Sequence, residues 1–347
     1  MQRTFTSLAE FLDHGHDCVI DVRAPAEFAE DHVPGAVNMP VLDDAERARV
    51  GTIHKQQSSF DARKIGAALV ARNAARHIET RLMGHDGGWR PLVYCWRGGQ
   101  RSGSFATILA QVGWRVQVVE GGYRSYRRMV QGNLYETVWP GEVILLDGNT
   151  GTAKTRLIAL LSEAGVQTLD LEGLAGHRGS VFGSVGEQPA QKGFETALAA
   201  AMSRLDPARP LLVEAESNKI GARSIPPALW GAMKRGRRIE VTAPVAERVG
   251  YLVTAYADIA SDIARLEPLI ESLRPFLGGE LTDLAITQAR GGQMADLAAL
   301  LVQHHYDPRY GRQRGTGQPA FCRVEMQRLD AAGLQGTADR IAAVIGA

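Results

Sequence analysis

The sequence predicts an α/β protein made of two successive parallel-sheet domains and a helical C-terminal portion. Three observations support this fold class. Short apolar runs of strand length alternate with helical segments, two of these runs lead through glycine-containing loops into helices, and the pattern after residue 245 is helical. The length of 347 residues also fits two domains with an appended helical piece, at ~150 residues per domain.

The first domain is expected over residues 1–130. Its strands are short apolar runs, and helical segments connect them, an alternation that is typical of a parallel sheet. The strands are expected at residues 18–23, within 32–40, at 91–94 and at 114–119. Helices are expected from Ala24, through most of residues 43–88 and from near Ser102.

The second domain is expected over residues 131–245, followed by a helical extension over residues 246–347 that packs on it. The predicted strands cover residues 142–147, 166–169, 211–214 and 238–242, and a helix is expected from Lys154. Breaks in the helical extension are expected at Pro268, at Pro275 and at Gly278-Gly279, because proline and glycine interrupt helices.

The overall charge neither indicates nor excludes a nucleic-acid partner. The 39 Lys and Arg residues nearly balance the 38 Asp and Glu residues, for a formal net charge of +1. Hydrophobic residues make up 45% and charged residues 22% of the chain, which is an ordinary globular composition. Any surface that binds a nucleic acid must therefore be a local basic patch.

The three cysteines, Cys18, Cys95 and Cys322, lie far apart in the sequence. They form no CxxC pair, zinc-type spacing or disulfide framework, so we expect a reducing cytoplasmic location. The N-terminal segment carries Glu10 and Asp13 and lacks the apolar run of a secretory signal. No stretch approaches the ~20 apolar residues of a membrane helix.

The first candidate site is the loop Cys-Trp-Arg-Gly-Gly-Gln-Arg-Ser at residues 95–102. Between a strand and a helix, backbone N–H groups form a concave nest and the helix N-terminus adds positive charge, so a thiol there ionises readily. We predict that Cys95 is a catalytic thiolate and that Arg97 and Arg101 bind a tetrahedral oxyanion. Gly98, Gly99 and Ser102 complete this phosphate-binding loop. The alternative is a structural cysteine, and a Cys95 closed off from solvent would contradict the catalytic interpretation.

The second candidate site is the loop Gly-Asn-Thr-Gly-Thr-Ala-Lys-Thr at residues 148–155, which follows a strand and opens a helix. This is the context of a Walker A motif, or P-loop, whose N–H groups bind a diphosphate at the helix N-terminus. Lys154 would neutralise the diphosphate, and Thr155 would hold Mg²⁺. Ala153 replaces the usual glycine, which the loop tolerates if this residue keeps a negative φ. The predicted phosphate-binding residues are Gly148, Gly151, Thr152, Lys154 and Thr155.

This interpretation would fail if Lys154 pointed away from any cavity, and the alternative is a glycine-rich turn with a chance lysine. Charged residues beyond the loop are candidates to complete the site. Asp170 and Glu214, with Glu172 and Glu216 beside them, could position a metal or act as a base. Arg178 and Lys192 could contact an anionic substrate. Each of these side chains could instead be an ordinary solvated charge.

The first domain resembles a rhodanese domain. The resemblance rests on Asp-Val-Arg at 21–23 with Glu27-Phe28, on residues 32–36, on the Cys95 loop and on residues 119–123. In sulfur-transferring rhodaneses, the loop arginine usually stands one position closer to the cysteine than Arg101 stands to Cys95. The longer loop is similar to that of rhodanese-related phosphatases and favours a phosphate-bearing donor over thiosulfate.

Over nearly its whole length, the chain resembles the bacterial tRNA 2-selenouridine synthases. The residues concerned are Gly51-Thr52, 55–57, the two loops, 177–180 and 306–308. The resemblance implies a transferase that attaches a geranyl group from geranyl diphosphate to the sulfur of a wobble 2-thiouridine. It then replaces the geranylthio group with selenium from selenophosphate.

Carried onto this chain, the resemblance places geranyl diphosphate at the P-loop, with Mg²⁺ as a candidate ion. Selenophosphate would bind at the Cys95 loop, where Cys95 acts as nucleophile or as selenium carrier. Partners would be tRNA and a selenophosphate-producing enzyme, and no haem, flavin or zinc is implied.

A tRNA substrate needs a surface for the anticodon loop and a uridine flipped out of its stack. Basic stretches at residues 124–128, 234–238 and 309–314 are candidates for that surface. The residues predicted to contact tRNA are Tyr123, Arg127, Arg128, Arg235, Arg237, Arg309 and Arg312, with Tyr123 as a stacking platform. Each stretch could instead be a solvated charged surface.

Three other functions fit parts of the sequence. A rhodanese-type sulfurtransferase fused to a nucleotide-dependent P-loop kinase or ATPase would turn over ATP or GTP and use thiosulfate. A non-catalytic tRNA-binding protein could use the P-loop as a nucleotide switch, but it would have no use for Cys95 in its nest. A phosphatase is suggested only by the length of the cysteine loop.

Overall fold

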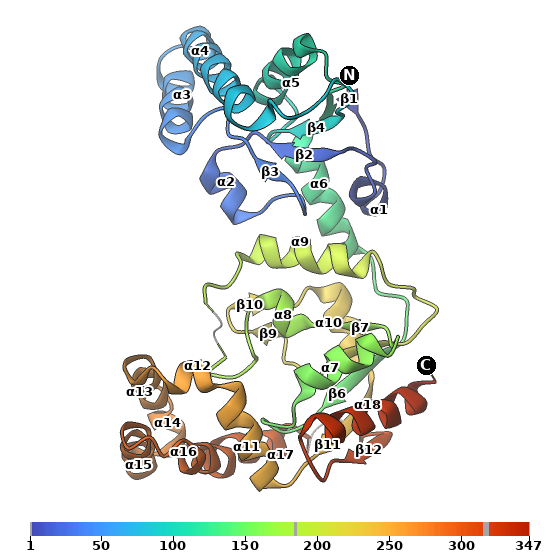
Figure 1. Cartoon of the computed structure of the whole chain (residues 1–347), viewed down its shortest axis with the longest axis vertical. Coiled ribbons are helices and arrows are strands. Elements are labelled where there is room, and N and C mark those ends of the chain that lie inside the picture. Colours follow the sequence, from blue (N-terminus) through green and yellow to red (C-terminus); the bar gives the residue numbers. More distant parts are fainter. Residues whose placement is uncertain (1, 184–185, 315–318, 347) are drawn as a thin grey trace. The chain divides into compact units, whose positions relative to one another are not determined.

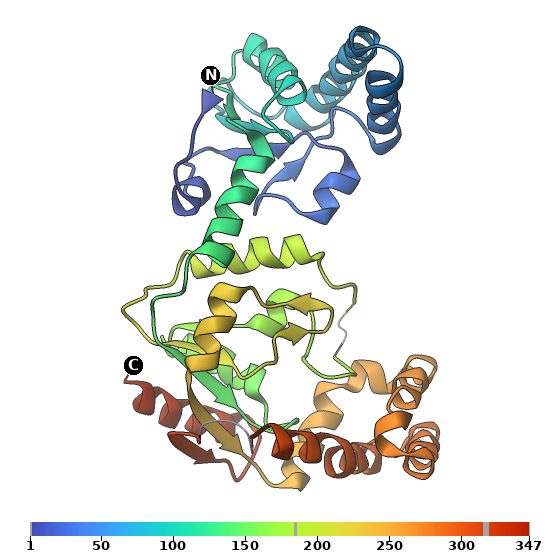
Figure 2. The same cartoon turned by 180° about the vertical axis from the view of Figure 1, so that it is seen from behind.

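The computed structural model describes residues 2–183, 186–314 and 319–346, with residues 311–314 as backbone only. The chain divides into two compact units (Figures 1 and 2). Unit 1 comprises residues 1–137 and 189–204, and unit 2 comprises residues 138–188 and 205–347. Each unit contains a five-stranded parallel sheet, so the predicted α/β fold class is confirmed. Within the described ranges, no helix is both long and apolar enough to cross a membrane.

Unit 1 is built on a sheet with the strand order β1-β5-β4-β2-β3. The strands are β1 (Gln2–Arg3), β2 (Cys18–Asp21), β3 (Val37–Asn38), β4 (Pro91–Tyr94) and β5 (Gln117–Val119). All four residues of β4 are buried, as expected for a central strand with both faces covered. The register pairs Asp21 with Tyr94, so the loops that follow β2 and β4 leave the sheet at the same edge. Cys95 lies at this edge.

Helices cover both faces of this sheet. They are α1 (Leu8–Leu12), α2 (Pro25–Glu30), α3 (Asp44–Gln56), α4 (Ser59–His77), the π-helical turn η1 (Ile78–Leu82), α5 (Gln100–Val112), α6 (Gly122–Gln131) and the turn η2 (Gly132–Glu136). Figure 1 shows α3, α4 and α5 on one face and α1 and α6 on the other. Asp43 and Glu46 form a capping box at the start of α3, which satisfies N–H groups that have no partner within the helix.

A helix from the middle of the chain, α9 (Gln191–Met202), belongs to unit 1. The sequence had placed residues 131–245 in the second domain, so this membership is a difference between prediction and structure. Phe194 and Leu198 of α9 are fully buried. Thr196 donates a hydrogen bond of 3.0 Å to the buried Asp31, and Glu195 pairs with Arg127. Burial of apolar side chains and these polar contacts together hold α9 in unit 1.

Unit 2 contains a sheet with the strand order β12-β11-β6-β8-β7. The strands are β6 (Val143–Asp147), β7 (Thr168–Leu169), β8 (Leu211–Glu214), β11 (Arg237–Thr242) and β12 (Cys322–Glu325), and β9 (Lys219–Ile220) and β10 (Arg223–Ser224) form a separate hairpin. Helices α7 (Lys154–Glu163) and α18 (Ala331–Ile345) share an apolar core with this sheet. Figure 2 shows α10 (Pro227–Arg235) across the sheet from α18. The short helix α8 (Leu171–Ala175) follows β7.

The remaining helices of unit 2 form a group with its own apolar core. They are α11 (Val245–Ala255), α12 (Ala257–Ala260), α13 (Ile263–Glu271), α14 (Arg274–Leu277), α15 (Gly279–Arg290), α16 (Met294–Leu301), the turn η3 (Val302–Tyr306) and α17 (Asp307–Arg314). The predicted break at Pro268 is wrong, because α13 continues through it and Ser272 N–H donates to the Pro268 carbonyl. Residues 246–347 are also not purely helical, because β12 joins the sheet beside β11.

Candidate functional site

The Cys95 loop connects β4 to α5 and packs backbone to backbone against the start of α6. Tyr123 N–H donates to the Cys95 carbonyl at 2.9 Å. Gly98 has φ +66°, and a Cβ there would come within 2.5 Å of the Val119 carbonyl. A Cβ on Gly122 would come within 2.2 Å of the Cys95 carbonyl. Glycine is therefore required at both positions, by close approach as well as by dihedral angle.

The surroundings of the Cys95 thiol favour its ionised form. Ser102, in the first turn of α5, donates a hydrogen bond from Oγ to the Cys95 sulfur at 3.1 Å. Burial raises the pKa of the Cys95 thiol, but hydrogen bonds from Ser102 and from the Arg97 backbone, together with the charge of Arg101, lower it further than burial raises it. A thiolate is the nucleophilic form of cysteine, so the site is chemically suited to nucleophilic attack.

Access to Cys95 differs from the prediction, because the residue is only 3% exposed. Arg101 Nη1 lies 2.8 Å from the Glu27 carboxylate, so its guanidinium is already paired. The prediction that Arg97 and Arg101 are both free to bind an oxyanion is therefore wrong for Arg101 in this structure. Cys95 is thus closed off from solvent in this structure, the condition that counts against the catalytic interpretation. A substrate could reach the sulfur only in another conformation of the loop.

Arg97 faces a basic hollow of unit 1 with a volume of about 660 Å³. Arg124 and Arg128, on α6, line the same hollow, and a tRNA contact of Arg128 stays a prediction. Tyr123 does not serve as a stacking platform, because it is 2% exposed and its hydroxyl donates to Asp31 at 2.6 Å. The prediction for Tyr123 is therefore wrong in this structure.

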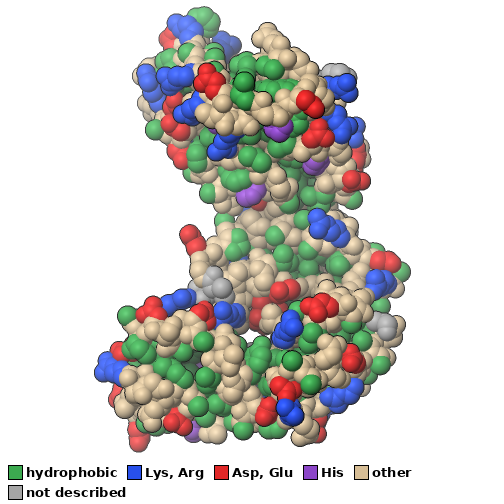
Figure 3. Space-filling model, viewed as in Figure 1, with side chains coloured by type: hydrophobic (Ala, Val, Ile, Leu, Met, Phe, Trp, Pro, Cys, Tyr) green, Lys and Arg blue, Asp and Glu red, His purple; other side chains and the backbone are tan. Residues whose placement is uncertain are grey.

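The remaining predicted tRNA contacts are divided among several environments. Arg127 pairs with Glu195 and is close to Asp31, so it stabilises α9. Arg237 forms an exposed pair with Glu142 at 2.6 Å. Arg235 is exposed at the end of α10, and the side chain of Arg312 lies outside the described residues. On the face in Figure 3, Lys and Arg side chains are interspersed with Asp and Glu.

The glycine-rich loop of unit 2 connects β6 to α7. Gly148 has no room for a side chain, since a Cβ would come within 2.5 Å of Thr152 Oγ1. The Thr152 hydroxyl donates to the Asn149 carbonyl at 2.8 Å and thereby closes the turn. Gly151 has φ +87° and Ala153 has φ +55°. The condition of a negative φ at Ala153 is therefore not met, and this alanine adopts the left-handed conformation that glycine would adopt without strain.

Lys154 lines a polar cavity of unit 2 with a volume of about 670 Å³. Its ammonium group donates to the Gly148 carbonyl at 2.7 Å. Arg178 and Arg309 line the same cavity, and Arg178 also pairs with Asp258 at 3.0 Å. Arg156 and Lys219 also line it, so five Lys and Arg side chains face two carboxylates, those of Glu172 and Glu216. This excess of positive charge at a helix N-terminus favours an anionic ligand.

Three carboxylates affect the electrostatics of this cavity. Glu214 ends β8, Glu216 follows that strand, and Glu172 follows β7. Burial and the Glu216 carboxylate raise the pKa of Glu172 to about 7, and burial raises that of Glu214 well above its usual range. Burial lowers the pKa of Lys154, but Tyr310 and the three carboxylates outweigh it, so the net shift is upward. Lys154 therefore carries its positive charge at neutral pH.

The predicted acidic residues take different roles. Asp170 is exposed and caps α8 through a hydrogen bond from Gly173 N–H at 2.7 Å. Glu214 is fully buried, and neither of its carboxylate oxygens has a hydrogen-bond partner in the described part of the chain. Glu172 accepts from the Thr155 hydroxyl at 2.9 Å. Lys192 lies in unit 1, where it pairs with Glu30 at 2.7 Å, so it is not part of this site.

Sequence reasoning missed a residue that holds the glycine-rich loop. Arg248 of α11 is 3% exposed and donates from Nε to the Thr150 carbonyl at 2.9 Å. It also binds Asp307, which in turn accepts from the Asn149 side chain at 2.8 Å. No local pattern around Arg248 indicates this role, because its partners are distant in sequence. Asp307 belongs to the Tyr-Asp-Pro segment that carried part of the family resemblance.

Two family models match successive parts of the chain. Residues 4–129 match the rhodanese-like domain family, and residues 141–268 match the family described as the tRNA 2-selenouridine synthase AAA domain. The tRNA 2-selenouridine synthase of Nitrosomonas europaea is 34% identical over 293 residues, covering 82% of this chain and 74% of the relative. That of Hahella chejuensis is 34% identical over 332 residues, covering 85% of each. The chain belongs to the tRNA 2-selenouridine synthase family.

Proposed function

We propose that this protein is a transferase that converts 2-thiouridine in tRNA to 2-selenouridine in two steps. The first step attaches a geranyl group from geranyl diphosphate to the sulfur. The second replaces the geranylthio group with selenium from selenophosphate. The proposal depends on two sites in one chain of this family. Lys154 lines a cavity with an excess of positive side chains, and the pKa of the Cys95 thiol is lowered.

In the first step, the bond between the geranyl carbon and the diphosphate oxygen breaks while a carbon–sulfur bond forms, and the uridine releases its N3 proton. Negative charge grows on the departing diphosphate. Lys154 and the N-terminus of α7 are suited to stabilise that charge. The N3 proton passes to solvent.

A magnesium ion fits the donors at this site. Thr155 and Glu172 provide oxygen ligands of the kind Mg²⁺ prefers, and the buried Glu214 carboxylate lacks a partner in the described structure. Thr155 and Glu172 would hold the ion, which would supply further positive charge to the diphosphate. No group of three or more His, Cys, Asp or Glu side chains arranged for a metal occurs among the described residues. The diphosphate oxygens would therefore provide other ligands.

The second step begins at selenophosphate. The Cys95 thiolate attacks phosphorus, which breaks the phosphorus–selenium bond and forms a sulfur–phosphorus bond. The hydroselenide released in this way attacks C2 of the uridine, and the carbon–sulfur bond breaks with release of geranylthiol. Water then releases phosphate and restores the thiol. This proposal makes Cys95 the nucleophile, and it requires the loop to open, because Cys95 is 3% exposed in the structure. It agrees with a loop that is longer than that of sulfur-transferring rhodaneses.

The test is to incubate the full chain with 2-thiouridine tRNA, geranyl diphosphate and selenophosphate, and to identify the nucleosides by mass. Cys95→Ala should stop selenium incorporation and leave geranylation largely intact, whereas Lys154→Ala should weaken geranylation. Equal loss of the same step in both variants would contradict the division of labour. Turnover of ATP or GTP without nucleoside modification would instead favour the kinase or ATPase alternative.

A further inference from the structure

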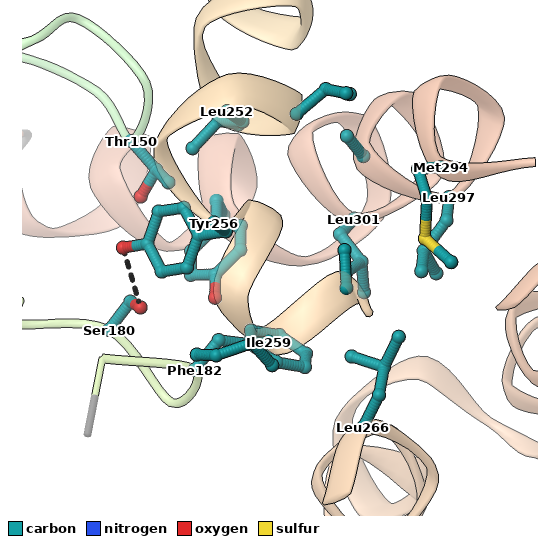
Figure 4. Close-up of a pocket in the computed structure, with 14 residues that line it drawn as sticks. Thr150, Ser180, Phe182, Leu252, Tyr256, Ile259, Leu266, Met294, Leu297 and Leu301 are labelled. Carbon is teal, nitrogen blue, oxygen red and sulfur yellow. Dashed lines mark hydrogen bonds between the residues drawn. The ribbon is translucent and has the colours of Figure 1, made fainter. Parts of the chain in front are cut away.

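An apolar cavity lies beside the glycine-rich loop of unit 2 (Figure 4). It has a volume of about 80 Å³, compared with the ~10–15 Å³ needed by one water molecule. Its walls include Phe182, Ile259 and Leu266, which are 7%, 1% and 4% exposed. An unfilled apolar cavity destabilises a protein, so a cavity of this size within a well-packed group of helices is a candidate ligand site.

The two ends of the cavity differ in chemistry. Figure 4 shows Thr150 and Ser180 at one end, where the Ser180 and Tyr256 hydroxyls are 3.1 Å apart and hydrogen-bonded. The opposite end is formed by aliphatic side chains, among them Met294 and Leu297 of α16. A ligand that fills the cavity must therefore be apolar along its length and polar only where it leaves at the Thr150 end.

The polar end adjoins the cavity lined by Lys154. Five residues line both cavities, namely Thr150, Ser180, Leu252, Tyr256 and Tyr306. Thr150 belongs to the glycine-rich loop itself, so an apolar chain in one cavity would be continuous with an anion in the other. The two cavities together match a molecule with a diphosphate head and a hydrocarbon tail.

We propose that the apolar cavity binds the hydrocarbon tail of the diphosphate substrate and that the aliphatic side chains Leu266, Met294 and Leu297 limit the length of that tail. This inference rests on the proposed function, which supplies an allylic diphosphate as substrate. It adds a second binding subsite, contributed by helices α11 to α13 and α16, which the glycine-rich loop alone does not contain.

A cavity-filling variant tests the subsite. Ala298 lines the cavity, and Ala298→Phe should lower the affinity for geranyl diphosphate at least ~10-fold, since each buried methylene contributes to binding. The affinity for inorganic diphosphate, which has no tail, should change less than about twofold on the same scale. The matched control is Leu284→Phe, at a side chain of α15 that is 46% exposed and outside the cavity lining. Isothermal titration calorimetry measures all four affinities.

A cavity-extending variant tests the limit on tail length. Leu297→Ala should shift the ratio of farnesyl to geranyl diphosphate affinities about 10-fold toward farnesyl, because the longer chain gains buried surface. Inorganic diphosphate binding again reports whether each variant is folded. An unchanged geranyl diphosphate affinity in folded Ala298→Phe would overturn the subsite. An unchanged farnesyl-to-geranyl ratio in Leu297→Ala would overturn the length limit.

A measurement of tRNA geranylation, made in addition to these titrations, distinguishes failure of the tail subsite from failure of the proposed function. Geranylation that proceeds normally in both Ala298→Phe and the unmodified chain overturns the tail subsite and leaves the function standing. Tail-dependent binding that Ala298→Phe abolishes supports the subsite even if the unmodified chain does not geranylate tRNA, and that result overturns the function alone.

Discussion

Arg248 and Asp307 form a two-bonded ion pair beside the glycine-rich loop. The two terminal nitrogens of Arg248 lie 2.9 Å and 2.7 Å from the Asp307 carboxylate oxygens. Through Arg248 Nε and the Thr150 carbonyl, this pair connects the loop that precedes Lys154 to both α11 and α17. The conformation of the loop therefore depends on helices far from it in sequence.

Removing this arginine should destabilise the protein and displace the loop. We expect Arg248→Ala to lower the free energy of unfolding by about 3 kcal/mol, because it leaves the partly buried Asp307 carboxylate without its charged partner and the Thr150 carbonyl without a donor. The control is Arg237→Ala, which breaks an exposed pair with Glu142 and should cost less than about 1 kcal/mol. Urea unfolding measures both changes, and equal costs would contradict the role assigned to Arg248.

Ser102 should control the ionisation of Cys95. In a Cys18→Ser, Cys322→Ser background, Ser102→Ala removes the hydrogen bond from Oγ to the sulfur and should move the pH midpoint of Cys95 alkylation upward. Ser104→Ala, on the same helix, is the control. The rate measured with iodoacetamide should also be low in the folded state, because Cys95 is 3% exposed. Fast alkylation at the rate of an exposed thiol would show that the loop is open in solution.

Glu172 should make stability depend on pH. Its pKa is raised to about 7 in the folded state, so between its ordinary value and about 7 the folded protein binds more protons than the unfolded chain. Stability should therefore fall as pH rises through this window and level off above it. Glu172→Gln should flatten the slope and recover on the order of 3 kcal/mol at pH 8. The control is Glu163→Gln, at an exposed carboxylate that ends α7.

That window can be checked by thermal unfolding between pH 4.5 and 8. A slope that persists unchanged in Glu172→Gln would assign it to another group, with the buried Glu214 as the first to examine by Glu214→Gln.

Ala153→Gly should not destabilise the protein, although glycine replaces alanine at the start of a helix. Ala153 has φ +55°, where an L-residue carries a strain of roughly 1–2 kcal/mol that glycine lacks. Relief of that strain should offset the entropy that glycine adds to the unfolded chain. In the matched variant Ala159→Gly, inside α7, no strain is relieved, so we expect a loss of about 1 kcal/mol. Equal losses in chemical denaturation would rule out strain at residue 153.

Local patterns predicted much of this protein. Both candidate loops lie where their strand–loop–helix context placed them, because apolar strands, glycines and helix starts act over a few residues. The alternation of strands and helices likewise predicted two parallel sheets. The Cys95 and Lys154 loops could thus be found without a structure, and so could the family resemblance, which depends on short motifs.

Residue types and spacing alone determined where the two loops lie and what chemistry they favour. Only the tertiary structure decided that α9 joins unit 1, that Arg101 is paired with Glu27, and that Tyr123 is buried against Asp31. It also decided that an apolar cavity adjoins the glycine-rich loop. These features depend on side chains far apart in sequence that meet only when the core forms, and no local pattern carries information about such partners.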